Sequence, residues 1–208
     1  IELNEQPHTH LLTAAQDFWR QHIAHSATLA PLVFKQQQSP QNMLATLSPF
    51  LGRPYLSTRL PENHLSDSQQ NLAALWQTVS TQLDTLETLF WQVHPQLNGK
   101  SYNTNSYQKV FAHLKTAAAA GRLPEQDKLA TFSLENLSNK TKKGGESDHP
   151  AYTQLAILAK LNQAIENVEQ AETAALVRLY IDLLDYLKQY NQQQKKSRHE
   201  RSFDDLLL

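Results

Sequence analysis

The feature that most constrains the fold is a long amphipathic pattern near the carboxyl end of the chain. Its apolar residues recur at alternating spacings of four and three, the period of a helix with one apolar face. They are Leu176, Tyr180, Leu183, Leu187 and Tyr190, with Val177, Ile181 and Leu184 beside them. The pattern predicts a helix over residues 171–199, about 43 Å long at the usual rise per residue. That length matches the width of a domain of this size, so we expect the other helices to lie along it.

The same predicted helix continues beyond its last apolar residue. Glutamines and lysines follow Tyr190, so we expect this end of the helix to project into solvent. Its basic side chains are either simply solvated or contact DNA or a neighbouring domain. The residues concerned are Lys195, Lys196, Arg198 and Arg201.

Helical periodicity recurs along the rest of the chain, with start and stop signals at its boundaries. The predicted helices are residues 9–25, a short piece at 29–34, a helix capped by Ser39 and begun by Pro40, a long helix from Ser66 or Asp67 to Pro95, one from Ser106 to Gly121, and one from Pro150. We expect Pro49 to interrupt the helix begun by Pro40. Because no stretch has a convincing strand pattern, we predict an all-α fold. It should be an irregular helical bundle organised on two long antiparallel helices, in a single domain over residues 1–208.

Composition limits the classes of function. The net charge is −1, which argues against a surface that is basic throughout, although local basic clusters remain open. The chain has no cysteine, so disulfides and cysteine-ligated zinc are excluded. No apolar stretch approaches the roughly 20 residues of a membrane span, so we expect no membrane partner.

The sharpest local motif is a lysine loop at residues 139–146. Lys140, Lys142 and Lys143 precede Gly144 and Gly145, which allow the backbone to approach a ligand closely. By itself the motif is more typical of a mobile loop whose lysines are only solvated. The alternative is phosphate contact, although the motif lacks the glycine spacing and the preceding strand of a P-loop.

Other candidate sites are weaker. His22 and His25 have a spacing that suits one metal ion, but no third ligand is near, so we expect packed or solvated histidines and no metal site. Asp182 and Asp185 are most simply the polar face of a helix. We find no catalytic arrangement of a nucleophile with a base and therefore expect no catalytic residues.

Three blocks of sequence, in their order and spacing, point to a known family. They are Asp17-Phe18-Trp19-Arg20, the lysine loop followed by His149-Pro150, and the stretch from Arg198 through Leu207. Together they resemble the beta chain of bacterial exodeoxyribonuclease V (RecB), a UvrD-like helicase family. The resemblance is to the helical 1B subdomain inserted in the first motor domain, and it covers nearly the whole chain.

The resemblance implies a parent that is an ATP-driven helicase and nuclease. In that family the beta chain works with gamma and alpha chains, as the RecBCD complex, in double-strand break repair and recombination in the bacterial cytoplasm. ATP and magnesium would bind outside this chain. Phe203, Asp204, Asp205 and Leu206 match a family motif, and residues 202–208 resemble the return into the motor domain. Because the chain begins with Ile1 and ends within an apolar run, we expect it to be a piece of a longer protein.

The function expected from these observations is a non-catalytic arm that contacts duplex DNA. The family's arm touches duplex DNA ahead of the fork, a role that carries over only loosely to Lys140, Lys142 and Lys143. The alternative is a protein-interaction module that docks the gamma chain without touching DNA. A stand-alone enzyme ranks third, because no assembled site is visible in the sequence.

Overall fold

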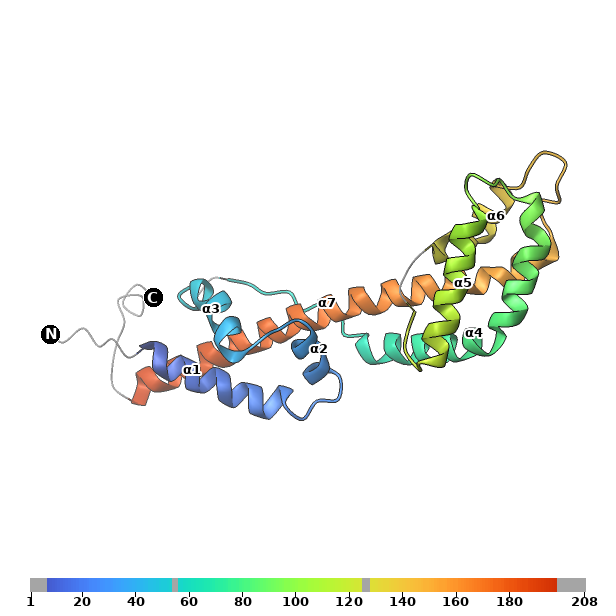
Figure 1. Ribbon diagram of the computed structural model, residues 1–208. Helices are drawn as coiled ribbons and strands as arrows, with labels where there is room; N and C mark the ends of the chain where they lie inside the picture. Colours follow the sequence, from blue (N-terminus) through green and yellow to red (C-terminus); the bar gives the residue numbers. More distant parts are fainter. Residues whose placement is uncertain (1–6, 54–55, 125–127, 198–208) are drawn as a thin grey trace. The chain divides into compact units, whose positions relative to one another are not determined.

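The structure, a computed structural model, describes residues 7–53, 56–124 and 128–197. Within these ranges the secondary structure is helical, with no strand, which confirms the all-α prediction (Figure 1). The only strand-like pairing in the described ranges is an isolated bridge between Leu97 and Thr141. The α-helices are α1 (Pro7–Phe18), α2 (Leu29–Lys35), α3 (Pro40–Leu51), α4 (Leu65–Val93), α5 (Thr104–Ala119), α6 (Leu134–Asn139) and α7 (Pro150–Ser197).

The described residues fall into two compact units. The first is formed by described residues within 7–65 and 171–197, and the second by those within 66–170. Helix α7 has 48 residues and contributes to both units. Each unit has a core of its own, so each is described separately, and the expectation of a single domain stays a prediction.

The length of α7 corrects the predicted start of the carboxyl-terminal helix at residue 171. The apolar pattern weakens between Asn162 and Ala174, which is why the sequence indicated two successive helices. That stretch contains neither proline nor glycine, so nothing interrupts the hydrogen bonding of the helix.

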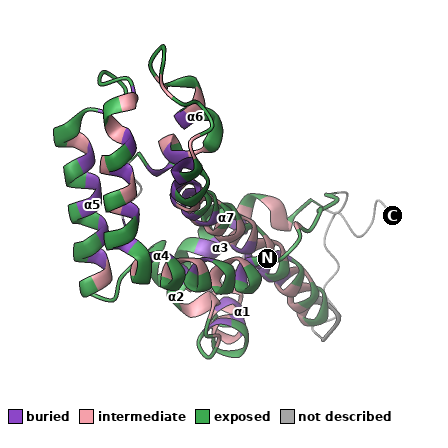
Figure 2. Ribbon diagram, turned by 90° about the vertical axis from the view of Figure 1, so that its right-hand side faces the viewer, coloured by how far each residue is buried: buried purple, intermediate pink, exposed green. Residues whose placement is uncertain are grey.

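The second unit is built on α4 and the first part of α7. Leu83 and Leu86 of α4 belong to one buried cluster with Leu155 and Leu158 of α7, which confirms the predicted pair of long helices. Helix α5 closes the cluster with aromatic rings. The ring of Phe90 is central, with centroids 5.0 Å from Tyr107, 5.5 Å from Phe111 and 5.5 Å from Phe132. Figure 2 shows such buried residues as bands along helices whose other faces are exposed.

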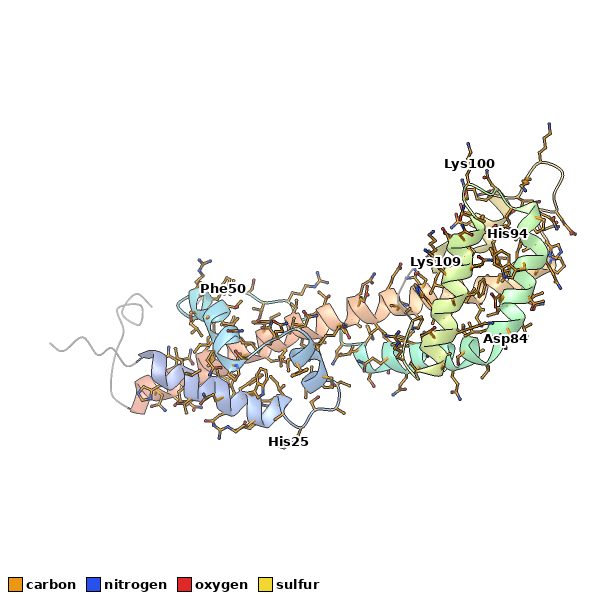
Figure 3. All side chains as sticks on the ribbon, in the orientation of Figure 1. His25, Phe50, Asp84, His94, Lys100 and Lys109 are labelled. Atoms are coloured by element: carbon orange, nitrogen blue, oxygen red, sulfur yellow. The ribbon has the colours of Figure 1, made fainter. Side chains whose placement is uncertain are left out.

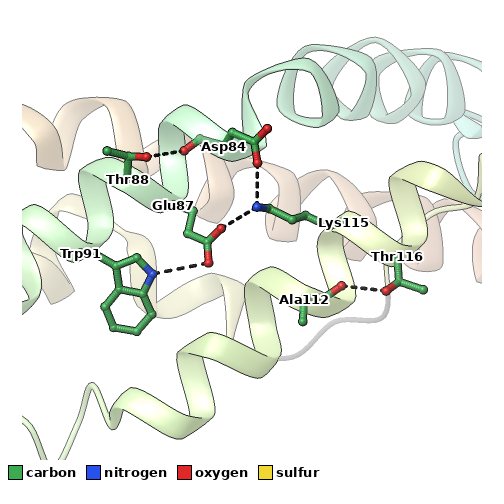
Figure 4. Close-up of polar contacts among 7 residues, drawn as sticks. All are labelled: Asp84, Glu87, Thr88, Trp91, Ala112, Lys115 and Thr116. Atoms are coloured by element: carbon green, nitrogen blue, oxygen red, sulfur yellow. Dashed lines mark hydrogen bonds and ion pairs between the residues drawn. The ribbon is translucent and has the colours of Figure 1, made fainter.

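An ion-pair cluster joins α4 to α5 on the surface of the same unit (Figure 4). Nζ of Lys115 lies 2.6 Å from Asp84 Oδ1 and 2.7 Å from Glu87 Oε2. These two hydrogen-bonded carboxylates raise the pKa of Lys115 above its usual range. Trp91 Nε1 donates to the other oxygen of Glu87 at 3.4 Å, so one glutamate is oriented by two partners.

The two ends of α5 show which sequence signals determine where this helix begins and ends. The cap of α5 is Asn103, whose side chain accepts from Ser106 N at 3.3 Å. The helix therefore begins at Thr104, two residues before the predicted Ser106. An Asx side chain is as good an N-cap as serine. At the other end Gly121 takes a φ of 62°, and Arg122 N donates to Ala117 O at 3.0 Å. This left-handed ending confirms the predicted stop at Gly121.

The first unit packs α1, α2 and α3 against the second part of α7. Phe18, Met43 and Leu47 share a buried cluster with Leu183 and Leu187. Ser39 accepts a hydrogen bond from Asn42 N at 3.1 Å, directly before Pro40, as predicted.

Two boundaries in this unit differ from the predictions. Helix α3 continues through Pro49 to Leu51, because a proline in the last turn sacrifices only one helical hydrogen bond. The helix predicted over residues 9–25 is α1 followed by a π-helical segment, η1 (Trp19–Ile23). In η1 the amide of Ala24 donates to Trp19 O at 3.0 Å. A π-turn holds an extra residue, which a period of 3.6 does not reveal.

Candidate nucleic-acid interface

The lysine loop joins α6 to α7 and is fastened to the segment that follows α4. Asn98 N donates to Lys140 O at 2.8 Å, and Lys142 N donates to Gln96 O at 2.7 Å. These bonds flank the bridge between Leu97 and Thr141. The loop is therefore paired with the fold along its first half, and whether its exposed lysines contact phosphate or are only solvated stays a prediction.

Thr141 anchors the loop from the inside. Its Oγ1 donates to Leu137 O at 2.9 Å and lies 2.9 Å from the hydroxyl of Tyr152, in the first turn of α7. Tyr152 and Leu137 are buried, so the anchor reaches the core of the second unit.

The two glycines of the loop have separate functions. Gly144 takes a φ of 90°, a left-handed conformation that side chains rarely adopt. Gly145 is required for space, because a Cβ atom there would lie 2.7 Å from Thr141 Cγ2 and 3.2 Å from Lys142 O. Directly beyond, Glu146 N donates to Gln96 Oε1 at 3.0 Å. The close backbone approach predicted from the glycines is thus made to the protein itself.

The three predicted lysines are all exposed but are not equivalent. Nζ of Lys142 donates to Pro95 O at 2.7 Å, so one of its three donors is already occupied. Lys140 and Lys143 form no ion pair with any residue that the structure describes. Their ammonium groups are therefore the more available pair.

The fold adds a fourth lysine that the sequence analysis did not identify. Lys100 is exposed in the turn after Asn98, and its amide donates to Asn98 Oδ1 at 3.0 Å (Figure 3). Because Asn98 N is bonded to Lys140 O, this turn lies beside the lysine loop. The Asn98-Gly99 turn was predicted, but its position next to residue 140 is a tertiary fact. We call Lys100, Lys140, Lys142 and Lys143 the basic tip.

The charge of the basic tip is partly offset nearby. Glu146, in the lysine loop, and Asp148, two residues beyond it, are exposed, so two carboxylates lie close in sequence to the four lysines. Lysine ammonium groups act as mobile point charges that suit phosphate oxygens. Such an arrangement can hold a phosphate backbone, but it contains no nucleophile paired with a base.

The other predicted site residues lie at the carboxyl end of the chain, and those that the structure describes belong to the first unit. Lys195 and Lys196 lie on α7, and their side chains are not described. Arg198 and Arg201 lie outside the described residues. So do the family-motif residues Phe203, Asp204, Asp205 and Leu206.

The described part of the chain contains no group of three or more histidine, aspartate or glutamate side chains that could hold a metal ion. The ring of His22 lies against that of Phe18, with centroids 4.6 Å apart and planes tilted by 37°. No helix in this part combines the length and the apolarity needed to cross a membrane.

Comparison with known proteins gives no further assignment. No protein-family model matches the chain, and no curated protein matches it.

Proposed function

We propose that this chain is a non-catalytic, DNA-contacting arm of an ATP-dependent DNA helicase and exonuclease similar to the exodeoxyribonuclease V beta chain. The observation that carries DNA contact is the basic tip, four lysines placed together by a loop and a turn that are hydrogen-bonded to each other. The parent is proposed from the three sequence blocks that resemble the family. Its role would be double-strand break repair and recombination.

The construction of the basic tip favours binding. A loop that is already paired along its first half loses less conformational entropy on meeting a ligand than a free loop does. No residue that the structure describes pairs with the ammonium groups of Lys140 and Lys143, so these groups can contact that ligand. Lysine contacts of this kind position a protein on the phosphate backbone without reading bases. The proposed contact is therefore with duplex DNA of any sequence.

The remaining parts of the proposal concern the parent. Gamma and alpha chains would be its partners, and ATP and magnesium would be bound by other domains of the longer protein. The arm would supply contact with duplex DNA only. The resemblance supports this part of the proposal, and the basic tip supports only the DNA contact.

A direct test compares two variants that each lose three lysines. Lys100→Ala/Lys140→Ala/Lys143→Ala removes the available cations of the basic tip, whereas Lys109→Ala/Lys160→Ala/Lys188→Ala removes the same charge elsewhere. Fluorescence anisotropy with a labelled duplex at low salt should show at least a tenfold loss of affinity, on the order expected for three phosphate contacts, for the tip variant. The control variant should lose about twofold or less. Equal losses in the two variants would contradict the proposal.

The alternative, docking of the gamma chain, has one observation in its favour. Phe34, on α2 of the first unit, is 86% exposed, an unusual state for a large apolar side chain. If docking is the function, Phe34→Ser should weaken co-elution with a purified gamma chain. The tip variant would then co-elute normally and bind DNA no worse than the control.

A further inference from the structure

The first unit contains an open groove that plays no part in the basic tip. Its volume is about 390 Å³, and α7 supplies most of its lining, with one residue each from α1, η1 and α2. A volume in this range admits a side chain together with part of its backbone. The lining combines aromatic rings, an apolar floor and carboxylates: Phe18, His22, Tyr186, Leu179, Asp182 and Asp185.

Three rings line the groove close to one another. The centroids of Phe18 and Tyr186 are 5.4 Å apart, and those of His22 and Tyr186 are 6.5 Å apart. Phe18 is buried, while His22 is exposed and Tyr186 is half-buried, so the outer two rings remain open to a ligand. His22 is on the π-helical segment, a type of backbone that occurs often at functional sites.

The charge of the groove is negative. Asp182 and Asp185 lie three residues apart on α7, and both are exposed. Arg178 approaches Asp182 only to 3.9 Å and also donates to Pro61 O at 3.5 Å, so this ion pair is long. Asp185 forms no ion pair among the residues that the structure describes. A ligand with a positive charge would therefore supply the close ion-pair partner that Asp182 and Asp185 lack among the described residues.

We infer that the groove binds an arginine side chain presented by a partner protein. A guanidinium group is planar, so it can stack on Tyr186, whose ring plane lies at 72° to that of His22, while its N–H donors reach Asp182 and Asp185. A lysine ammonium group can form ion pairs but cannot stack in this way. The two carboxylates repel phosphates, so the groove is distinct from a DNA contact. The inference goes beyond the proposed function and does not depend on it.

The test uses the whole chain and three short peptides observed by NMR. The probe is acetyl-Gly-Arg-Gly-amide, and the comparison peptides carry citrulline or lysine in place of arginine. Citrulline keeps the shape of arginine but has no charge. The arginine peptide should cause saturable shifts of the amide signals of residues 18–23 and 179–189. The citrulline peptide should cause none, and the lysine peptide should bind several-fold more weakly.

Variants then assign the binding to the groove. Asp182→Asn/Asp185→Asn should weaken binding of the arginine peptide by about fivefold or more, and Tyr186→Leu by about threefold. The control Asp148→Asn removes an exposed carboxylate of the second unit and should change nothing. Because Asp182 and Asp185 are exposed, the double variant should fold normally. The inference is overturned if the arginine peptide gives no saturable shifts, or if the citrulline or lysine peptide binds as tightly as the arginine peptide. It is also overturned if Asp148→Asn loses as much affinity as Asp182→Asn/Asp185→Asn.

Discussion

The methyl group of Thr141 occupies the space that a side chain at Gly145 would need. A Cβ atom on Gly145 would lie 2.7 Å from Cγ2 of Thr141. Thr141 cannot rotate away without cost, since its hydroxyl is bonded to Leu137 O and to Tyr152. The conformation of the lysine loop thus depends on a glycine and a threonine four residues apart.

Gly145→Ala should therefore destabilise the second unit by about 1–3 kcal/mol, the usual cost of overpacking. Gly99→Ala is the matched control, because a Cβ atom at Gly99 meets nothing within 4 Å. The control should cost about 0.5 kcal/mol or less. Urea unfolding in a Trp19→Phe background, where fluorescence reports only Trp76 and Trp91 of this unit, measures both. Equal stabilities for the two variants would contradict this prediction and show that the Thr141 side chain rotates away at little cost.

A second prediction concerns alkaline pH. Burial, followed by the charges of Tyr107 and Tyr152, raises the pKa of Tyr102 well above its usual range. Above about pH 10 the unfolded chain ionises this phenol while the folded chain does not, so the free energy of unfolding falls as pH rises. The stabilisation is complete below pH 10 and is lost through the folded-state pKa.

The variant Tyr102→Phe tests this linkage. At pH 7 it should lose about 0.5–1.5 kcal/mol, because the Tyr102 hydroxyl donates to Thr131 O at 2.7 Å. Between pH 10 and 11 the free energy of unfolding should then fall less steeply for the variant than for the wild type. The two slopes should differ by up to about 1.4 kcal/mol per pH unit. Tyr190→Phe, in the first unit, serves as the control. Parallel curves for Tyr102→Phe and wild type would contradict the assigned cause.

Lys115→Met should cause a small loss of stability, smaller than that of Gly145→Ala. The ion pairs with Asp84 and Glu87 are on the surface, where screening leaves little net gain. Because the pKa of Lys115 is raised, the contribution should be constant at neutral pH and disappear only at strongly alkaline pH. Thermal unfolding with and without high salt checks this, because the difference between variant and wild type should shrink in salt. A difference that is independent of salt would contradict an ionic origin.

The lysines of the basic tip should separate into two kinds. Lys142→Ala removes a hydrogen bond to Pro95 O and should cost up to about 1 kcal/mol of stability. Lys140→Ala and Lys143→Ala should stay within about 0.5 kcal/mol of the wild type. The loss of DNA affinity should follow the reverse order, with the smallest loss for Lys142→Ala. A single series of unfolding and binding measurements covers all three variants.

Much of the fold was predictable because helical signals are local. The apolar period located α4, and Ser39 with Pro40 located the start of α3, whereas α7 was predicted as two successive helices. Local signals also failed in specific ways. The cap at Asn103 was overlooked in favour of Ser106, and the π-turn at Trp19–Ile23 leaves no periodic trace.

The candidate site was only half predictable. Lys140, Lys142 and Lys143 could be identified from the sequence alone, because they lie within four consecutive residues. Lys100 could not, because it joins them only through the bond between Asn98 N and Lys140 O, across some forty residues. The groove was missed for the same reason. Asp182 and Asp185 indicate no more than a polar helix face until His22 and Phe18 are placed beside them.

The most direct test of DNA contact by the basic tip is the salt dependence of binding. Log affinity for a labelled duplex should fall linearly with log salt concentration, with a slope proportional to the number of phosphates neutralised. Removing Lys100, Lys140 and Lys143 together should reduce that slope by about 2–3 units, equally for duplexes of different sequence. The control without Lys109, Lys160 and Lys188 should keep the wild-type slope. Matching slopes for wild type and the tip variant would contradict the account and leave these lysines as solvated charge.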